Sequence, residues 1–502
     1  MTRDREMRLQ QLVGRLSEAR LLNAADVPIG GVTNDSRRTA PGDLFIAIRG
    51  TQVDGHRFIP QALERGAAAL VCEDPPSPLP ECPVVQVADG RRAVSALADA
   101  FYGSPSRDLT VAGITGTDGK TSTTEILRAI LNEAGHPAGS VGTLGCWIDG
   151  RRLDVGLTTP DAIALHDMLG RMHRVGLTHA CMEVSSHSLI QRRVADEDFD
   201  AAVLTNITRD HLDTHGTREN YARAKRMLFE QLKPDAVAVL PAGGEFTESF
   251  RTHTRAEVLT YGPPGLADVS GRVLDQSMRG MEMLVQTPFD ACCFRTRLIG
   301  SYNCLNILAA TTVAFACGIR MAVVKEALRT FPGVPGRLEK VGVAGRTDLP
   351  RVAVDYAHTP EALDKVLATL RPLVKGKLVC VVGCGGDRDT TKRPIMGSIA
   401  AREADIAVFT ADNSRSERTE DIIDQMLGGV ETPGRNCRVE PDRRRAIELA
   451  IKVAATPDSM VLVAGRGCEQ FQKLGDRRIP FDDRIVTRQI LDGIPSQQKK
   501  SA

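Results

Sequence analysis

The chain has 502 residues, enough for about two to four domains. It is 42% hydrophobic and 25% charged, with a formal net charge of +1 and only 4% aromatic residues, which argues against an electrostatic nucleic-acid binder or a base-stacking platform. Met1 to Leu21 has no apolar core and no run is long enough to cross a bilayer, so we expect no signal peptide, no membrane insertion and a cytoplasmic location.

The first unit, residues 1 to about 105, has the pattern of a small α/β domain. Asp43–Ile48 and Ala69–Cys72 predict strands, and His56–Ala69 predicts a helix between them. The polar cluster Asn34–Arg37 precedes a Pro-Gly pair, and its chemistry alone favours a plain turn.

A glycine-rich loop between a strand and a helix comes next. Leu109–Ile114 is a short apolar run typical of a buried strand, and apolar residues recur at helical spacing from Ile126 to Leu131 before Gly135. The loop reads Gly116-Thr117-Asp118-Gly119-Lys120-Thr121-Ser122. Its two glycines allow the backbone to wrap a phosphate, Lys120 would reach the outer phosphates, and the Thr121 hydroxyl can hold Mg²⁺.

The stricter pattern G-x-x-x-x-G-K-[ST] is absent, because Ile114 stands at the first glycine position. An ordinary turn that caps a helix is therefore the alternative. The order strand, loop, helix favours a nucleoside triphosphate site over that turn, but it does not name a reaction.

Polar residues follow the next predicted strands. Strand His179–Val184, which contains Glu183, runs into Ser185 and His187, and strand Phe199–Thr205 is followed by Asp210 and His211. Ligands of open parallel sheets bind beyond the carboxyl ends of strands, so we predict Mg²⁺ contacts here, either direct or through water. Each histidine taken singly is more often a hydrogen-bonded structural residue.

The region from Ala267 to Arg297 predicts short antiparallel strands, and Gly300 opens a helix that runs through Ala316. Phe331–Gly336 is a rigid Pro/Gly connector. We place domain boundaries so that the three domains cover residues 1–105, 106–333 and 334–502.

The last domain repeats the α/β pattern with strands at Arg351–Val354, Leu378–Val382, Asp405–Phe409 and Met460–Ala464. The glycines after the second strand lack the dinucleotide spacing G-x-G-x-x-G. Strand-end loops and their neighbours carry both signs of charge, at Arg388, Arg393, Arg415, Asp387, Asp412 and Glu469. That mixture suits a zwitterionic ligand, and a surface ion-pair network is the alternative.

The twelve cysteines include no C-x-x-C pair, and most lie in apolar runs. We expect reduced core residues rather than zinc ligands or disulfides.

Several ordered motifs resemble those of the Mur ligases of peptidoglycan synthesis, and the resemblance runs from about Asp35 to about Arg488. They are Gly116–Thr121, Glu183–His187, Thr205-Asn206 with Arg209–His211, Gly300-x-x-Asn303-x-x-Asn306 and Pro335–Glu339. The resemblance implies a three-domain α/β fold: a small UDP-binding N-terminal domain, a central ATP-binding P-loop-type domain with a mostly parallel sheet, and a Rossmann-like C-terminal domain for the amino acid.

The similarity is greatest to the members that add the third peptide residue, and it implies a monomeric ligase. ATP would phosphorylate the D-glutamyl carboxylate of UDP-N-acetylmuramoyl-L-alanyl-D-glutamate. The amine of meso-diaminopimelate would then attack the acyl phosphate.

By the same resemblance, residues 116–122 bind the triphosphate with Asn303, Asn306 and Arg337, and Mg²⁺ is held by Thr121, Glu183, His211 and Lys225. Lys120, Glu183, His211 and Lys225 are the implied catalytic residues, and Lys225 matches a lysine that the family carbamylates. By its spacing alone Lys225 would be a surface lysine on a helix. The implied substrate residues are Ser36 near the uridine, Thr158, Thr159, Ser185, Gln191 and Arg193 for the muramoyl dipeptide, and Arg388, Asp412, Asn413, Ser414, Arg415, Gly465 and Glu469 for the amino acid.

Three positions depart from the family pattern: Asp118 replaces an asparagine, Ser414 a proline, and Cys468 a histidine. The rival interpretations are a lysine-adding ligase, a folylpolyglutamate synthetase and a catalytically silent homologue that binds without reacting. Arg415 argues against lysine, the N-terminal domain argues against folate, and the presence of Lys120, Glu183, His211 and Lys225 argues against silence.

Overall fold

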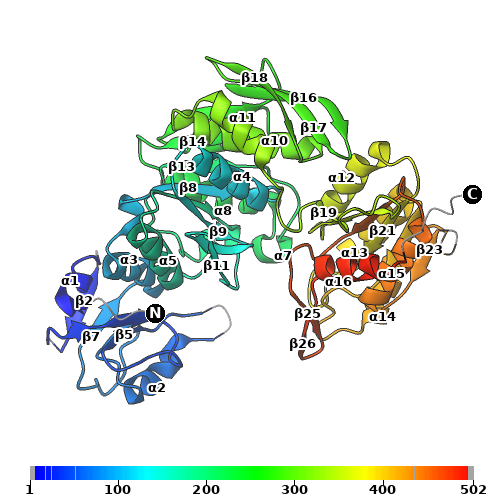
Figure 1. Cartoon of the computed structure of the whole chain (residues 1–502). Coiled ribbons are helices and arrows are strands. Elements are labelled where there is room, and N and C mark those ends of the chain that lie inside the picture. The colour runs from blue at the N-terminus through cyan, green and yellow to red at the C-terminus, as the bar shows by residue number, and fades with distance from the viewer. Residues whose placement is uncertain are drawn as a thin grey trace, which may run out of the picture.

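The computed structural model describes residues 6–495 except 17, 24, 51, 52, 433 and 435. The polar stretch after Pro495, for which the sequence suggests no packed structure, lies outside the described residues. The chain forms three sheet-containing parts that follow one another in sequence (Figure 1). The amino-terminal part meets the central part, and the carboxyl-terminal part lies on the other side of the central one.

The amino-terminal part is a five-stranded sheet in the order β2-β7-β6-β5-β4, with β2 antiparallel to its neighbour and the rest parallel. A short β1–β3 pair lies beside it. The elements are β1 (Met7–Arg8), α1 (Leu9–Val13), β2 (Ala19–Leu22), β3 (Pro28–Ile29), β4 (Gly31–Thr33), β5 (Asp43–Ile46), η1 (Gly55–Phe58), α2 (Ile59–Glu64), β6 (Ala69–Cys72), β7 (Val84–Val87), α3 (Gly90–Tyr102) and η2 (Pro105–Arg107).

The helix predicted over His56–Ala69 is shorter than expected. It consists of η1 followed by α2, which ends at Glu64. Gly66 adopts a left-handed conformation with φ +88° and forms the turn that ends the helix. A glycine at this place stops the helix before the apolar residues that continue into β6.

The central part is an eleven-stranded sheet in the order β11-β10-β9-β12-β8-β13-β14-β15-β16-β17-β18, parallel from β9 to β16 and antiparallel at both edges. The predicted antiparallel region after Ala267 is confirmed as β16–β18 at one edge. The elements are β8 (Thr110–Thr115), α4 (Lys120–Glu133), β9 (Ala138–Gly142), β10 (Gly145–Ile148), β11 (Arg151–Leu153), α5 (Ala162–Arg174), β12 (His179–Glu183), α6 (Ser186–Ile190), β13 (Ala201–Leu204), α7 (Leu212–His215), α8 (Arg218–Glu230), β14 (Val237–Pro241), α9 (Thr247–Arg251), β15 (Glu257–Gly262), β16 (Val269–Ser277), β17 (Gly280–Gln286), β18 (Ala291–Thr296), α10 (Ser301–Ala316) and α11 (Met321–Thr330).

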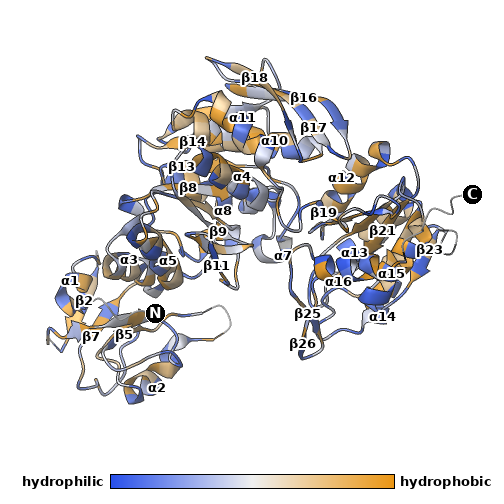
Figure 2. Ribbon diagram, viewed as in Figure 1, coloured by the Kyte–Doolittle hydropathy of each residue, from blue (hydrophilic) through white to orange (hydrophobic). Residues whose placement is uncertain are grey.

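Two apolar clusters cover the two faces of the central sheet. One joins α4, α10 and α11 to one face, with Ile126 and Ile307 among its fully buried members. The other joins α5 and α8 to the opposite face through residues such as Leu165 and Phe229. Apolar residues concentrate in the strands and the inward sides of the helices (Figure 2), as burial of apolar surface requires.

The carboxyl-terminal part is a six-stranded sheet in the order β19-β20-β24-β21-β22-β23, in which only β19 is antiparallel. Helices α12–α14 cover one face and α15 and α16 the other. The elements are β19 (Glu339–Val341), β20 (Arg351–Val354), α12 (Pro360–Leu370), η3 (Arg371–Leu373), β21 (Leu378–Val382), α13 (Lys392–Glu403), β22 (Ile406–Phe409), α14 (Thr419–Leu427), β23 (Cys437–Val439), α15 (Arg443–Ala454), β24 (Met460–Val463), the hairpin β25 (Phe471–Leu474) and β26 (Arg477–Pro480), and α16 (Asp483–Asp492).

All twelve cysteines are free thiols. Eight of them are buried, as expected of core residues, whereas Cys293 and Cys317 are exposed. No helix within the described ranges is both long and apolar enough to cross a membrane.

Candidate active site

The phosphate loop lies between the end of β8 at Thr115 and the start of α4 at Lys120, as the sequence predicted. Gly116 has φ +146°, and a Cβ there would lie 1.8 Å from the Thr205 hydroxyl, so no side chain fits. Gly119 has φ +87° and leads directly into the first turn of α4. The loop therefore presents backbone N–H groups at a helix N-terminus, an arrangement that binds phosphate.

Two lysines meet inside this loop. Lys120 Nζ donates to the carbonyls of Gly116 and Thr117, both at 2.8 Å, and Lys225 Nζ donates to the Gly116 carbonyl at 2.8 Å. Lys225 is only 1% exposed, so the expectation of a surface lysine is wrong. Burial, and then the nearby Lys120 ammonium, lower the pKa of Lys225 well below its ordinary value.

Glu183, at the end of β12, is buried beside the loop. Its carboxylate accepts hydrogen bonds from the Thr121 hydroxyl at 3.0 Å and from the Thr143 backbone N–H at 2.7 Å. A Cβ on Gly142 would lie 2.3 Å from Glu183 Oε1, so a glycine is needed for this approach. Burial raises the pKa of Glu183, and Lys120 is close enough for its charge to oppose that shift.

His211 lies in an aromatic and acidic group close enough to Lys120 and Lys225 to feel their charges. It lies 3.4 Å from an Asp210 carboxylate oxygen, and its ring is 4.8 Å from His187 and 6.3 Å from Tyr221 between centroids. Burial lowers the pKa of His211 to about 4, although Asp210 opposes the shift. His211 is therefore a neutral imidazole at neutral pH, which is the form that can bind a metal ion.

Three further nucleotide residues predicted from the sequence converge on the loop. Asn306 Nδ2 donates to Asn303 Oδ1 at 3.1 Å, and Asn306 Oδ1 lies 2.4 Å from where a Gly119 Cβ would stand. Arg337, from the segment that enters the carboxyl-terminal part, donates to the Thr121 hydroxyl at 3.0 Å.

Five residues assigned to the muramoyl dipeptide form one continuous cluster beyond β12. The Thr159 hydroxyl donates to the Glu183 carbonyl at 2.8 Å and accepts from the Ser185 N–H at 3.1 Å. Arg193 donates to the Thr159 carbonyl at 2.9 Å and to the Gln191 side chain at 2.6 Å. Thr158 shares a 3.1 Å hydrogen bond with Thr143, which connects this cluster to the Glu183 carboxylate.

Ser36 lies apart from these groups, in the loop after β4. It is 6% exposed, and its hydroxyl donates to Gln61 Oε1 at 2.6 Å. The neighbouring Asp35 pairs with Arg37 in a local turn, as the sequence suggested. This loop lies at the far end of the molecule from the amino-acid residues described next.

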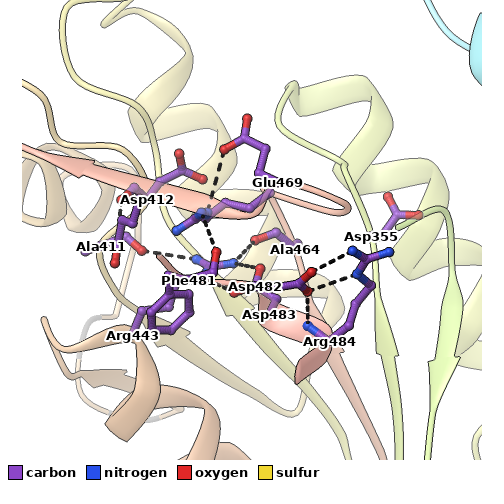
Figure 3. Close-up of polar contacts among 12 residues, drawn as sticks. Asp355, Ala411, Asp412, Arg443, Ala464, Glu469, Phe481, Asp482, Asp483 and Arg484 are labelled. Carbon is purple, nitrogen blue, oxygen red and sulfur yellow. Dashed lines mark hydrogen bonds and ion pairs between the residues drawn. The ribbon is translucent and has the colours of Figure 1, made fainter. Parts of the chain in front are cut away.

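The carboxyl-terminal residues gather at the carboxyl ends of β22 and β24. Asn413 Nδ2 donates to Glu469 Oε2 at 2.8 Å, and a Cβ on Gly465 would lie 2.7 Å from Asp412 Oδ2. Burial, and then the nearby Asp412 carboxylate, raise the pKa of Glu469. Figure 3 shows the Asp412 and Glu469 side chains on the same side of this sheet edge.

Arg415 faces the loop after β21. Its backbone has φ +51°, its N–H donates to the Lys473 carbonyl at 3.2 Å in the β25–β26 hairpin, and its guanidinium donates to the Gly386 carbonyl. Arg388 is exposed on that same loop. The Ser414 hydroxyl is instead paired with Thr419 at 2.6 Å, so it stabilises the start of α14 and does not face Asp412 or Glu469.

The pattern of charges had also suggested Arg393 as a ligand-binding residue. It lies on α13, fully buried, and donates to Glu417 at 2.7 Å and to the Gly385 carbonyl at 3.1 Å. Arg393 therefore forms an ion pair, but a buried one and not part of the surface network that was the alternative. Sequence reasoning also missed Thr143, which follows β9 at a strand end and contacts Glu183 with both its N–H and its hydroxyl.

Comparisons with known proteins identify the family. The chain matches the Mur ligase family catalytic domain over residues 28–102, the Mur ligase middle domain over 114–314 and the Mur ligase glutamate ligase domain over 336–467. A UDP-N-acetylmuramoyl-L-alanyl-D-glutamate–2,6-diaminopimelate ligase from Geobacillus thermodenitrificans is 42% identical over 488 residues, 96% of this chain and 99% of that protein. The chain belongs to the Mur ligase family.

Other relatives agree with this assignment. The ligase of the same name from Gloeobacter violaceus is 42% identical over 487 residues, 97% of this chain and 98% of that protein. A solved structure of such a ligase, 31% identical, superposes with a TM-score of 0.66 and covers 93% of this chain and 95% of its own. A Mur ligase from Thermotoga maritima in complex with ADP, at 19% identity, covers 92% of this chain and 95% of its own and shares the fold with a TM-score of 0.64.

This Mur ligase is an ATP-dependent amide ligase of peptidoglycan synthesis. Its three-domain α/β fold with mostly parallel sheets is the one that the motifs implied. Among the described residues, no three His, Cys, Asp or Glu side chains come together as a ready-made metal site.

Proposed function

We propose that this Mur ligase joins an amine of meso-diaminopimelate to the D-glutamyl carboxylate of UDP-N-acetylmuramoyl-L-alanyl-D-glutamate. The relatives named for this reaction, at 42% identity over nearly the whole chain, support the proposal. We also propose domain boundaries at residues 105–106 and 333–334, since each of the three segments holds its own main sheet.

The observation that carries the choice of amino acid is the paired set of opposite charges at the end of the carboxyl-terminal sheet. Asp412 and Glu469 are carboxylates suited to an ammonium, while Arg415, with Arg388 on the facing loop, is suited to a carboxylate. Diaminopimelate carries a carboxylate at its distal end, whereas lysine carries only an ammonium there. A site that keeps an arginine for the distal carboxylate rejects a ligand that lacks it.

The reaction begins with transfer of the γ-phosphoryl group of ATP to a D-glutamyl carboxylate oxygen, which gives an acyl phosphate and ADP. The substrate amine, once it has lost a proton, attacks the acyl carbon. The C–N bond forms as the C–O bond to phosphate breaks, and inorganic phosphate leaves. Lys120 and the N–H groups of the loop would hold the triphosphate, and Thr158, Thr159, Ser185, Gln191 and Arg193 would hold the dipeptide.

Mg²⁺ fits the donor set near the loop. Glu183 is a buried carboxylate, the Thr121 hydroxyl lies 3.0 Å from it, and Lys120 and Arg337 are the cations that act on it. These are the hard oxygen ligands that Mg²⁺ prefers, and phosphate oxygens would complete its shell. Bound Mg²⁺ would neutralise charge on the transferring phosphoryl group, with Glu183, Thr121 and His211 as its protein ligands.

Lys225 would provide one more anion after carbamylation. Burial lowers the pKa of Lys225, which favours the neutral amine that can attack CO₂. The new N–C bond gives a carbamate and releases one proton, so the neutral amine becomes an anion suited to a second Mg²⁺.

Phosphate release with ATP, Mg²⁺ and UDP-N-acetylmuramoyl-L-alanyl-D-glutamate tests the proposal, with meso-diaminopimelate compared with L-lysine. We expect turnover with meso-diaminopimelate only. Turnover with lysine but not with meso-diaminopimelate would contradict the choice of amino acid. In that case Arg415→Met should not change the KM for lysine. In an enzyme selective for meso-diaminopimelate, Arg415→Met raises its KM by about tenfold or more while the KM for ATP stays near the wild-type value.

A further inference from the structure

A buried ion pair lies directly behind the proposed amino-acid pocket. Arg443 is the first residue of α15 and Asp483 the first residue of α16. Their side chains are fully buried and form a two-pronged contact, from Arg443 Nε to Asp483 Oδ1 at 2.8 Å and from Nη2 to Oδ2 at 2.7 Å. The carboxylate stands at a helix N-terminus, where negative charge is favoured.

The same guanidinium also binds two separate chain segments. Arg443 Nη1 donates to the Ala411 carbonyl at 3.1 Å, and Nη2 donates to the Ala464 carbonyl at 2.9 Å. Figure 3 shows Arg443 reaching both carbonyls as well as Asp483.

Each of these two alanines directly precedes a residue of the proposed amino-acid pocket. Ala411 directly precedes Asp412 at the end of β22, and Ala464 directly precedes Gly465 at the end of β24. The two strands are not neighbours, because β21 lies between them in the sheet. The guanidinium of Arg443 donates to both carbonyls and therefore fixes the distance between the loop after β22 and the loop after β24, which the sheet does not join directly.

The pair has no catalytic contact of its own. Burial alone would lower the pKa of Arg443, but Asp483 more than offsets this and the pKa is raised, so the guanidinium stays charged. With four of its N–H donors directed at Asp483, Ala411 and Ala464, little of it remains to bind a ligand.

We propose that Arg443 and Asp483 are a positioning pair that sets the spacing between Asp412 and Gly465 and so the affinity for the amino acid. The inference rests on the proposed function in one respect: it takes the loops that carry Asp412 and Gly465 as the amino-acid pocket. The pair acts through Ala411 and Ala464, and the ATP and dipeptide sites should not depend on it.

The test compares purified variants that remove the contacts of Arg443 without leaving a buried charge. Removing one partner alone would strand the other charge, so the informative variant is Arg443→Met/Asp483→Leu, which replaces both by apolar side chains of similar size. We expect it to fold, with the KM for the amino acid raised about tenfold or more and the KM for ATP and for the dipeptide within about twofold of wild type.

Two further variants separate positioning from stability. Arg443→Lys keeps a positive charge beside Asp483 but lacks the planar guanidinium that contacts both carbonyls. We therefore expect it to be as stable as wild type, while the KM for the amino acid stays raised. Arg371→Met/Asp405→Asn is the control for position in the sheet: Arg371, which is partly exposed, pairs with Asp405 at 2.6 Å and donates to two carbonyls at the opposite end of the same sheet. It should leave all three KM values unchanged.

Hydrogen exchange supplies a readout that needs no turnover. In the apo double variant, peptides covering residues 410–415 and 464–469 should exchange faster than in wild type, and the dipeptide cluster near Thr159 should not. A folded double variant with wild-type exchange and wild-type KM would overturn the inference, as would an equal KM increase in the Arg371 control. Absence of turnover in wild type with either amino acid would count against the proposed function instead, and exchange would still decide the role of the pair.

Discussion

Asp118 places a carboxylate in the phosphate loop, 3.7 Å from the ammonium of Lys365 on α12. The two groups come from different parts of the chain, and both are partly exposed, so the pair is worth about 1 kcal/mol or less. The carboxylate adds negative charge beside the place proposed for the triphosphate, and Lys365 compensates for it.

Asp118→Asn should therefore lower the KM for ATP by about two- to fivefold, since it removes a like charge and keeps the side-chain shape. Lys365→Met should raise the KM for ATP, and the double variant shows whether the two effects are coupled. A rise in the ATP KM of Asp118→Asn would show that the carboxylate assists nucleotide binding.

Lys225 permits a direct test of carbamylation. Lys225→Arg keeps a long basic side chain but cannot form a carbamate, so we expect kcat to fall on the order of 100-fold or more. ¹³C-bicarbonate should give a carbamate NMR signal in wild type that is absent from this variant. Lys233→Arg is the control, because Lys233 is half exposed and pairs with Asp198. Wild-type turnover by Lys225→Arg would rule out the carbamate.

At the scale of elements, helices α3 and α5 enclose a buried acid and imidazole where the first two parts of the chain meet. His166 Nδ1 on α5 lies 3.3 Å from Glu197 Oε1, with Asp99 of α3 at 3.9 Å. Burial lowers the pKa of His166 to about 3 and raises the pKa of Glu197 to about 8. At neutral pH the carboxyl of Glu197 is therefore protonated and the imidazole of His166 is neutral.

A raised carboxyl pKa means that folding takes up a proton at neutral pH. Between pH 6.5 and 8, stability should therefore fall as pH rises, by at most about 1.4 kcal/mol per pH unit from this group. His166 opposes the trend only below its ordinary pKa of 6.5. Glu197→Gln should flatten the decline in Tm across this range, and an unchanged slope would show that Glu197 does not control it.

Much of the fold was predictable because buried parallel strands are short apolar runs. Ala69–Cys72, Arg351–Val354 and Leu378–Val382 form strands with the predicted bounds. The β25–β26 hairpin that holds Arg415 was missed, because most of its side chains are exposed and give no apolar pattern.

The site was predictable where a motif or a strand end marked it, as at Gly116–Thr121 and Glu183. The burial of Lys225 and the contacts of Arg443 could not be predicted in this way. Lys225 contacts a residue 109 positions away, and Arg443 contacts residues 21 to 40 positions away. Sequence spacing carries no information about such contacts.

At the scale of the whole molecule, the nucleotide and amino-acid groups lie on different parts of the chain (Figure 1). Arg337 reaches Thr121 and Lys365 reaches Asp118. Gly336 is fixed within the carboxyl-terminal part, where its Cβ would lie 2.2 Å from the Cys468 nitrogen. The connector before Gly336 is therefore the natural hinge for closing one part on the other.

We expect small-angle scattering to show a lower radius of gyration when a non-hydrolysable ATP analogue and the UDP-dipeptide bind together. The analogue alone should give a smaller change, because the dipeptide also has to be enclosed. An unchanged radius in the ternary mixture would argue that the parts are already in their working arrangement.

The most direct test of the proposed reaction is a competition. Equal concentrations of meso-diaminopimelate and L-lysine are given to the enzyme with ATP, Mg²⁺ and the UDP-dipeptide, and the nucleotide products are weighed by mass spectrometry, which reports the ratio of kcat/KM values. Arg415 and the acidic pair Asp412 and Glu469 predict a product that contains diaminopimelate almost alone. A predominant lysine product would contradict the assignment of the pocket while leaving the chain a Mur ligase.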